Sequence, residues 1–519
     1  MAAKATVIQH YDVLIIGGGI AGIAIAELLA RTTSLRIKVI DCAPQLGTEA
    51  SGKLEGWFHA GALYSGHDDA QTFMNCLNGL QDLITLYSSY FPTRCNLVLQ
   101  ERHPNVFVPS VQRAVGGWFH DANVSYILPT HESPDIKLSR LKSDPVLWEI
   151  QRQRVLNRLE ASFGQQYSWL QGGQCLAPTL AQIEEYNGGL CSLIEPSGIL
   201  DALCKRHDES FGVSASHYDI VKSADVSMSP SSIMRDLVAS AISNGVDFET
   251  GLTIETLVTD RFRPSRLKSL VCRHQNGSLN NLKASVFIFA VGSGFKTLLP
   301  QLQLRVKVKM NKSVMAVASP SLVNLNFVRM SMKDKFHFNH LAQHANTDRG
   351  PVRYSILANS GFSNDGPDLE AAHDVADLDQ LLDAAERYFG KEELYSRRLY
   401  SYECIKTEFM SEEEGKRRYS YWIEWNRESN YISVLPGKFS FFPTVAHQTY
   451  MKVKECLGFK EVDPKDRYLT DQTHEQLAQH LVAEHYPLAI VAESGTFKLS
   501  PPQEIVQNKS QPEAPVTGI

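Results

Sequence analysis

The sequence predicts an α/β protein in which a parallel sheet carries helices on its faces and a second, mixed sheet builds another domain. Three segments lead to this prediction. A strand, turn, helix and strand open the chain at 12–41, a β-rich run ending in small residues follows at 284–294, and a strand leading into a helix follows at 431–446. Buried strands that alternate with helices are typical of parallel sheets. The wide separation of the three segments predicts that the first domain is discontinuous.

The first segment, D-V-L-I-I-G-G-G-I-A-G, joins a buried strand to a glycine turn. Gly17, Gly19 and Gly22 have G-x-G-x-x-G spacing directly after the apolar run 13–16. The first glycine allows the tight turn, the second removes a side chain that would block a phosphate, and the third allows the helix to pack on the strand. The apolar helix expected over 23–30 then points its N-terminal amides at an anion.

A second strand, expected at 36–40, ends in Asp41, about 20 residues beyond the turn, where an acidic side chain accepts hydrogen bonds from a ribose. The order of these elements predicts a Rossmann-like dinucleotide-binding unit. A chance glycine turn is one alternative. Another is a membrane span over the mostly apolar run 13–30, but the turn glycines, Glu27 and the lack of a basic flank argue against it.

Composition narrows the class of protein further. Charged residues make up 21% and hydrophobic residues 43% of the chain, as in ordinary soluble proteins, and 519 residues fit two or three domains. The net charge of −6 argues against a nucleic-acid partner. Nine scattered cysteines without a C-x-x-C pair argue against a disulfide framework and a cysteine zinc site. Nothing in the first ten residues looks secretory, so we expect a cytoplasmic protein.

The loop at 47–66, G-T-E-A-S-G-K-L-E-G-W-F-H-A-G-A-L-Y-S-G, shows which dinucleotide to expect. With it the sequence resembles the FAD-dependent oxidoreductases of the D-amino-acid oxidase type, and is most similar to their glycerol-3-phosphate dehydrogenase and 2-hydroxyglutarate oxidase branches. In that family, S-x-K-L followed by H-x-G passes the pyrophosphate and then runs beside the isoalloxazine ring. The matching residues are Ser51, Lys53, Leu54, His59 and Gly61, with three extra residues between the two halves.

The run A-S-V-F-I-F-A-V-G-S-G at 284–294 extends the resemblance, since flavoproteins of this kind close their dinucleotide domain with such a strand and a small-residue turn. Upstream, helical spacing predicts a helix over 230–244 with Gly245 as its C-terminal cap. The run 246–257 then reads as strands. Relatives hold the adenine there by main-chain contacts, and Ile254 is the matching residue.

The segment 431–446, Y-I-S-V-L-P-G-K-F-S-F-F-P-T-V-A, resembles the terminal G-G-K-x-T-T motif of the glycerol-3-phosphate dehydrogenase branch. This resemblance implies that Gly437 and Lys438 lie near the pyrimidine edge of the flavin, where negative charge develops on reduction. A solvated loop lysine is the alternative for Lys438.

The resemblance implies FAD rather than NAD as the cofactor. The cofactor-binding residues that we expect are Gly17, Gly19, Ile20, Ala21, Gly22, Asp41, Cys42, Ser51, Gly52, Lys53, Gly61, Ile254, Ala290, Gly292, Gly437, Lys438 and Phe439. We expect no metal. Asp334, His337, His340 and His344 would suit one only on a helix, whereas the alternation at 335–338 reads equally well as a strand that scatters them.

His59 is the first catalytic candidate. By resemblance it lies beside the flavin ring as a proton acceptor or orienting group. Two alternatives stay open. Dimethylglycine and sarcosine dehydrogenases carry flavin covalently on the histidine of a similar W-H-A-A-G-L stretch, although here Phe58 separates Trp57 from His59. The second alternative is that His59 has a structural role, with its ring hydrogen-bonded to the backbone.

Lys438, Tyr64 and Arg427 complete the catalytic candidates. Tyr64 matches a tyrosine that lines the family pocket, and core packing explains it almost as well. Arg427, near the last motif, could bind a substrate carboxylate, and a charged hairpin is the alternative. Leu63 stands where the glycerol-3-phosphate branch has an arginine for the phosphate, which argues against that substrate.

The domain prediction assigns 1–90, 194–300 and 431–457 to the FAD-binding domain and 91–193 and 301–430 to the substrate domain. A helical extension follows at 458–498, where Thr473 and Gln476 have capping-box spacing. The proline-rich polar stretch 499–519 is expected to be a disordered tail.

The function expected from this resemblance is transfer of a hydride from a C–H bond next to an amine or alcohol to flavin N5. The substrate would be a small amine or 2-hydroxy acid, and oxygen and quinones both stay open as electron acceptors. We expect no transmembrane segment and leave peripheral membrane contact open. The alternatives are a flavin monooxygenase or reductase fed by NAD(P)H and a non-catalytic FAD-binding scaffold.

Overall fold

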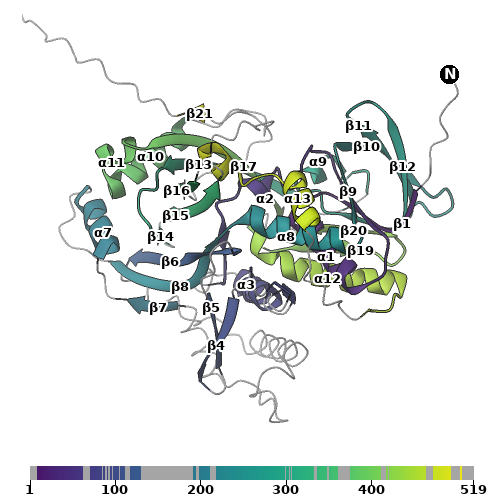
Figure 1. The fold of residues 1–519 in the computed structure, drawn as a ribbon, viewed down its shortest axis with the longest axis horizontal. Coiled ribbons are helices and arrows are strands. Elements are labelled where there is room, and N and C mark those ends of the chain that lie inside the picture. Colours follow the sequence, from purple (N-terminus) through teal and green to yellow (C-terminus); the bar gives the residue numbers. More distant parts are fainter. Residues whose placement is uncertain are drawn as a thin grey trace, which may run out of the picture.

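A computed structural model of the chain describes residues 9–61, 70–129, 191–359, 375–462, 472–492 and 503–504, apart from short gaps within the second, third and fourth ranges. Each of the two lobes in Figure 1 is built on one large β-sheet. The first sheet has eight strands and the second has eleven. The predicted fold class, an α/β protein with a Rossmann-like unit and a second mixed sheet, is confirmed.

The first sheet forms the lobe on the right of Figure 1. Its strands are β1 (Gln9–Ile16), β2 (Ile37–Asp41), β9 (Asp247–Thr250), β10 (Leu252–Thr259), β11 (Leu267–His274), β12 (Leu279–Phe289), β19 (Trp422–Trp425) and β20 (Tyr431–Leu435). The order is β10-β11-β12-β1-β2-β9, and β20 pairs with both β12 and β19. Because β9, β2, β1, β12 and β20 pair in parallel, their carboxyl ends meet at one edge. Ligands of open α/β sheets bind at such an edge.

Helix α1 (Ile20–Thr32) is the central helix of this lobe and packs against α8 (Pro230–Ser243) and α12 (Phe442–Leu457). Glu27 is fully buried in it, accepting 2.7 Å and 2.9 Å hydrogen bonds from Arg31 Nε and Ser240 Oγ. These donors compensate the burial of its charge. Residues 13–30 are therefore a strand and a helix, so the membrane-span alternative is wrong. Across the described ranges, no helix is long and apolar enough to cross a membrane.

The segment after α8 folds as expected. Gly245 has a φ of +89° and donates its amide to the carbonyl of Ile242, which ends the helix as the predicted cap. The run expected to form strands divides into β9 and β10, which are separated by Gly251 at a φ of +74°.

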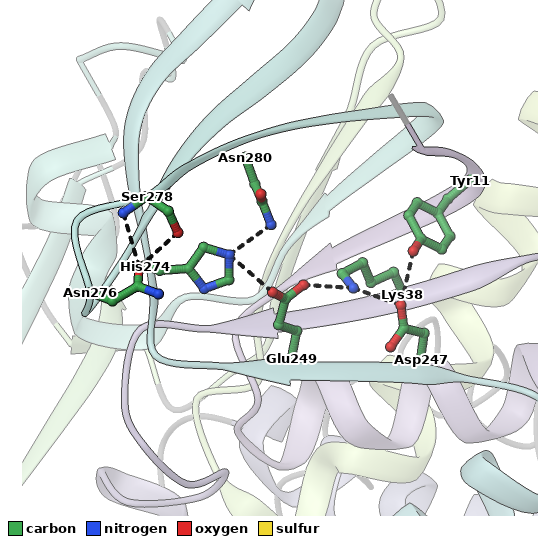
Figure 2. Close-up of polar contacts among 8 residues, drawn as sticks. All are labelled: Tyr11, Lys38, Asp247, Glu249, His274, Asn276, Ser278 and Asn280. Carbon is green, nitrogen blue, oxygen red and sulfur yellow. Dashed lines mark hydrogen bonds and ion pairs between the residues drawn. The ribbon is translucent and has the colours of Figure 1, made fainter. Parts of the chain in front are cut away.

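A charged network joins four strands of the first sheet away from the glycine turn (Figure 2). Lys38 on β2 is almost completely buried, and its Nζ lies 2.6 Å from Asp247 Oδ2 and 2.7 Å from Glu249 Oε2, both on β9. Tyr11 donates to Asp247 from β1, and His274 of β11 lies 3.3 Å from Glu249. The network fixes β9 in register at the sheet edge.

The second sheet forms the lobe on the left of Figure 1. Its strands are β3 (Trp57–Phe58), β6 (Phe119–Pro129), β7 (Cys191–Ile194), β8 (Tyr218–Met228), β13 (Lys307–Ser319), β14 (Asn326–Ser331), β15 (Phe336–Thr347), β16 (Gly350–Asn359), β17 (Arg398–Met410), β18 (Arg417–Arg418) and β21 (Gln503–Glu504). The order is β18-β17-β13-β16-β15-β14-β6-β8-β3, with β7 on β8 and β21 on β17. It is mixed, since β14 and β6 pair in parallel among antiparallel neighbours.

The remaining elements lie outside the two large sheets. Two larger helices, α7 (Gly198–Ser210) and α10 (Val375–Phe389), contribute apolar side chains to one core with the second sheet. The others are α2 (Ala50–Lys53), α3 (Ala70–Leu83), β4 (Leu97–His103), β5 (Val106–Val111), η4 (Gly292–Gly294), α9 (Phe295–Leu298), α11 (Lys391–Tyr395), η5 (Phe439–Phe441), α13 (Gln472–Leu481) and α14 (Tyr486–Val491). Helix α13 corresponds to the helix expected in the C-terminal extension.

The domain ranges stay a prediction, but the strand pairing differs from them at four places. Strand β3, expected in the FAD-binding domain, pairs with β8 in the second sheet. Strand β8, expected in the FAD-binding domain, pairs with β6 in the second sheet. Strand β19, expected in the substrate domain, forms a hairpin with β20 of the first sheet. Gln503–Glu504, within the expected disordered tail, pairs with β17, and the rest of the tail lies outside the described residues.

The histidine series lies in β15. His340 is buried, where Nδ1 lies 2.8 Å from the carbonyl of Leu325 and Nε2 lies 2.7 Å from Ser355 Oγ. Its ring stacks on Phe327. These contacts make it a core histidine. Asp334 lies outside the described residues, and within them no group of three or more His, Cys, Asp or Glu could hold a metal ion.

Candidate active site

A cavity of about 580 Å³ lies at the carboxyl edge of the first sheet. It is bounded by the residues after β1, β2, β12 and β20, by the loop at 47–59, and by β17 of the second sheet. Fourteen of the predicted site residues line it: Gly17, Gly19, Ile20, Ala21, Asp41, Cys42, Ser51, His59, Ile254, Ala290, Gly292, Gly437, Lys438 and Phe439. Three segments far apart in sequence thus meet at one cavity.

Gly17 and Gly22 in the motif after β1 have no room for a side chain. Gly17 has a φ of +107°, and a Cβ there would lie 2.3 Å from the carbonyl oxygen of Ala290. A Cβ at Gly22 would lie 2.0 Å from the carbonyl oxygen of Gly17, so this residue serves helix packing and does not line the cavity. Gly19 is the N-cap of α1. The first amides of α1 therefore begin at the cavity wall, where an anion is favoured.

Asp41 and Ser51 both bind the backbone of this turn. Asp41 Oδ2 accepts a hydrogen bond of 2.6 Å from the amide of Gly18, and its Oδ1 accepts one of 2.8 Å from Ala43. Burial raises the pKa of Asp41, and these two bonds oppose that rise. Ser51 Oγ accepts a hydrogen bond of 3.1 Å from the amide of Ile20. The loop at 47–53 therefore lies directly against the N-terminus of α1.

His59 follows the short strand β3. Its amide donates a 3.0 Å hydrogen bond to Ser440 Oγ, and its ring lies 4.2 Å from that of Trp57 between centroids. Nδ1 is 3.5 Å from Asp225 Oδ2. Burial lowers the pKa of His59, the contact with Asp225 raises it in part, and the charge of Lys438 lowers it further. The lowered pKa favours the neutral imidazole.

Lys438 reaches the cavity through a turn that only glycine can make. Gly437 has a φ of +68°, and a Cβ there would lie 2.2 Å from the carbonyl oxygen of Ser420. Lys438 then has extended backbone and leads into η5 and α12. The predicted order of strand, glycine, lysine and helix is present.

Other predicted residues lie beside the cavity without lining it. A Cβ at Gly52 would lie 2.2 Å from the carbonyl oxygen of Gly47, which makes it a packing residue. Lys53 Nζ is 3.7 Å from Glu49 and 5.8 Å from the ring centre of Tyr486. Gly61 has a φ of +114° and does not line the cavity. Tyr64 and Leu63 lie outside the described residues.

Arg427 requires a correction. Its side chain is 83% exposed, pairs with Glu455 over 2.8 Å, and lines a separate surface cavity of about 630 Å³. The reason is topological. The tight turn at 426–429 precedes β20, so it lies at the amino end of the parallel strands, whereas Lys438 follows the carboxyl end. The charged-hairpin alternative is the one that the structure supports.

Four acidic or basic residues of the site were not anticipated: Glu55, Asp225, Lys406 and Glu408. Lys406 Nζ lies 3.4 Å from Glu55 Oε1, and both line the cavity. Glu408, two residues further along β17, is buried and accepts a 2.5 Å hydrogen bond from Asn311. Glu55 lies in the loop at 47–66 but matches no residue of its motif. Asp225, Lys406 and Glu408 lie in strands of the second sheet, whose long-range pairing leaves no local sequence signal.

A family model described as FAD dependent oxidoreductase, of the D-amino-acid oxidase (DAO) type, matches residues 12–414. This range is well over half of the chain, and the protein belongs to that family. The predicted family, the oxidoreductase class and FAD as the cofactor are thereby confirmed. The branch within the family stays a prediction. A search of curated protein sequences gives no match.

Solved structures share the fold at low sequence identity. A glycine oxidase from Geobacillus kaustophilus has a TM-score of 0.53 and 13% identity, over 86% of this chain and 95% of its own. An FAD dependent oxidoreductase from Pseudomonas aeruginosa has a TM-score of 0.52 and 13% identity, over 88% and 93%. An L-proline dehydrogenase from P. horikoshii has a TM-score of 0.52 and 12% identity, over 92% and 100%. At these identities the similarity shows the fold alone.

The residues at the cavity fit FAD. Gly17, Gly19 and Gly437 line the cavity without side chains, so a cofactor can approach their backbone closely. The N-terminus of α1 suits a pyrophosphate, and Lys438 supplies a cation in the lining of the same cavity.

Proposed function

We propose that this protein is an FAD-dependent dehydrogenase or oxidase that oxidises a small amine or 2-hydroxy acid at the C–H bond next to nitrogen or oxygen. The observation that carries the proposal is the single cavity bordered by Gly17, His59 and Lys438. When bound, FAD supplies the hydride acceptor, its N5 atom. The protein supplies orientation, a shielded pocket and charge.

The predicted cofactor residues divide by the part of FAD that they would hold. Gly17, Gly19 and the first amides of α1 would bind the pyrophosphate, and Asp41 would bind a ribose hydroxyl. Main chain at Ile254 would contact the adenine. Lys438 would lie at the pyrimidine edge, where it favours the reduced state.

His59 is proposed as the proton acceptor of the reaction. Its neutral imidazole can take the proton of the substrate N–H or O–H, so that the freed electron pair forms the imine or carbonyl double bond. The nearby charge of Lys438 disfavours protonation of His59 before substrate arrives. His59 is proposed to bind FAD without a covalent bond.

Lys406 is proposed as the partner of a substrate carboxylate, in place of Arg427. It enters the cavity from the second sheet, where Glu55 contacts its ammonium group. The names of two proteins that share the fold, glycine oxidase and L-proline dehydrogenase, agree with an amino acid as the substrate class. The electron acceptor stays open between oxygen and a quinone.

A cytoplasmic location is part of the proposal. The cysteines that the structure describes are free thiols, as expected in a reducing compartment. Peripheral contact with a membrane would be compatible with a quinone acceptor.

An anaerobic titration tests the function. The FAD-loaded protein is mixed with a panel of D- and L-amino acids, secondary amines and 2-hydroxy acids, and loss of the visible flavin absorbance is followed. We expect bleaching by one substrate class and strongly reduced rates in His59→Gln. Bleaching by NADPH alone would favour the monooxygenase or reductase alternative. Bleaching by none of these compounds, despite chemical reducibility, would favour a scaffold.

A further inference from the structure

Asp225 on β8 is a fully buried carboxylate at the junction of three strands. Its Oδ1 accepts a 2.8 Å hydrogen bond from the amide of Ala60, next to His59. Its Oδ2 accepts a 2.6 Å bond from the hydroxyl of Tyr126 on β6 and a 3.2 Å bond from the indole Nε1 of Trp57 on β3. His59 Nδ1 lies 3.5 Å from the same Oδ2. The carboxylate thus accepts hydrogen bonds from residues before and after His59 in the sequence, and from Tyr126.

This arrangement requires a group that only accepts hydrogen bonds. An ionised carboxylate can accept from three or four donors at once, whereas an amide of the same shape must present two N–H groups on one side. The indole of Trp57 can only donate. Asp225 Oδ2 accepts from the indole and so carries no proton to donate. His59 Nδ1, which faces the same oxygen, can form a favourable contact with it only as a protonated N–H donor. The geometry therefore favours the His59 tautomer that is protonated at Nδ1.

The remaining contacts of His59 hold its ring in one orientation. The backbone is bound to Ser440, and the ring lies against Trp57 at an angle of 44°. Nδ1 is buried on the side of Asp225, while the residue lines the cavity. Nε2, with its lone pair, is then the nitrogen available to a substrate.

We propose that Asp225 is a positioning residue that holds the His59 imidazole protonated at Nδ1, so that Nε2 presents a lone pair to the substrate proton. This inference rests on the proposed function of His59 as a proton acceptor. The charged groups that face His59 are Asp225 from β8, Lys438 from the turn before η5, and Glu55 from the loop before β3. Asp225 stabilises the imidazolium formed after proton transfer, and Lys438 opposes it.

The tautomer can be measured directly. We would record long-range ¹H–¹⁵N NMR correlations of the FAD-loaded protein with ¹⁵N-labelled histidine, using His59→Gln to assign the signal. The wild type is expected to show His59 protonated at Nδ1. Asp225→Asn is expected to move the proton to Nε2 or to mix the two tautomers. A wild-type signal with the proton on Nε2 would overturn the proposal without reference to any variant or substrate.

Ser223→Ala is the matched control. Ser223 lies on the same strand, bonds to the carbonyl of Val124 and the backbone amide of Asp225, and does not touch the carboxylate. Replacing Ser223 with alanine is expected to perturb the packing of β8 and β6 while leaving the Asp225 side chain in place. The control is expected to keep the wild-type tautomer. If Asp225→Asn and Ser223→Ala behave alike, the role of Asp225 is structural and the proposal fails.

A kinetic readout completes the test with any substrate found by the titration. Asp225→Asn is expected to slow flavin reduction by about 10²-fold, within the usual range for general-base catalysis, and to retain FAD. Asp225→Glu, which keeps the carboxylate, is expected to recover part of the rate and the wild-type pH profile. If no substrate reduces the flavin of the wild type, the proposed function fails, whereas the tautomer measurement still decides the role of Asp225.

Discussion

The backbone amide of Gly18 donates a hydrogen bond of 2.6 Å to Oδ2 of Asp41. This bond joins the middle of the glycine turn after β1 to the end of the neighbouring strand β2. The predicted ribose-binding acid therefore also fixes the shape of the turn that would receive the pyrophosphate. Gly47 adds a second tie, since its amide donates to the carbonyl of Gly18.

Gly17→Ala is expected to abolish FAD uptake. Its Cβ would meet the carbonyl oxygen of Ala290 at 2.3 Å, and a φ of +107° already strains any other residue by about 1 kcal/mol or more. The ratio of visible to ultraviolet absorbance of the purified protein measures the bound flavin. Gly245→Ala is the control, because Gly245 has a similar φ of +89°, does not line the cavity, and its Cβ would have no atom within 4 Å. Loss of FAD in both variants would contradict steric exclusion at Gly17.

Lys438→Met is expected to make the flavin midpoint potential more negative by about 30 mV or more, a tenfold change for a two-electron couple. A cation near the pyrimidine edge stabilises the negative charge of the reduced state, and its removal loses that stabilisation. Equilibration with a reference dye gives the potential without a substrate. Arg427→Met serves as the control, since its exposed side chain pairs with Glu455 outside the cavity. Equal shifts in the two variants would argue against Lys438 at the flavin.

Lys38→Met is expected to lower the free energy of unfolding by about 1–3 kcal/mol, because it leaves Asp247 and Glu249 without a shared ammonium partner. Urea denaturation followed by fluorescence would measure the loss. Lys205→Met removes a lysine that is 59% exposed and paired with Asp201 on α7, and it is expected to have no measurable effect. If Lys38→Met unfolds at the same urea concentration as the wild type, the network of Figure 2 does not contribute to stability.

His340 is expected to make stability depend on pH. Burial lowers its pKa from 6.5 to about 4. Between these values the folded protein holds fewer protons than the unfolded chain, so stability falls as the pH falls, by up to about 1.4 kcal/mol per pH unit. His340→Gln should flatten the slope of stability between about pH 7 and pH 5. His480→Gln, on the surface of α13, should leave the slope unchanged.

The sequence predicted best those parts of the site whose function depends on backbone. Gly17, Gly19 and Gly437 each lie between a strand and the helix that follows it. Their local context is therefore sufficient to identify the turns. The same holds for Asp41, which ends β2 at a fixed distance from the first turn. Short-range patterns encode these features because the turns are made by adjacent residues.

Side chains brought in by long-range pairing were not predictable in this way. Asp225 and Lys406 lie in ordinary alternating strands, and only the register of the second sheet places them beside His59 and the cavity. Arg427 shows the converse. Its nearness in sequence to Lys438 suggested a shared site, but five residues of strand β20 separate the two ends of the sheet.

The hydrogen bond between the amide of His59 and Ser440 Oγ joins residues 381 positions apart. The chain must therefore be synthesised as far as Ser440 before this pair can meet. Contacts of such long sequence separation form slowly. A chain that stops before Lys438 lacks the residues 438–440 that line the cavity, so it is expected not to retain flavin.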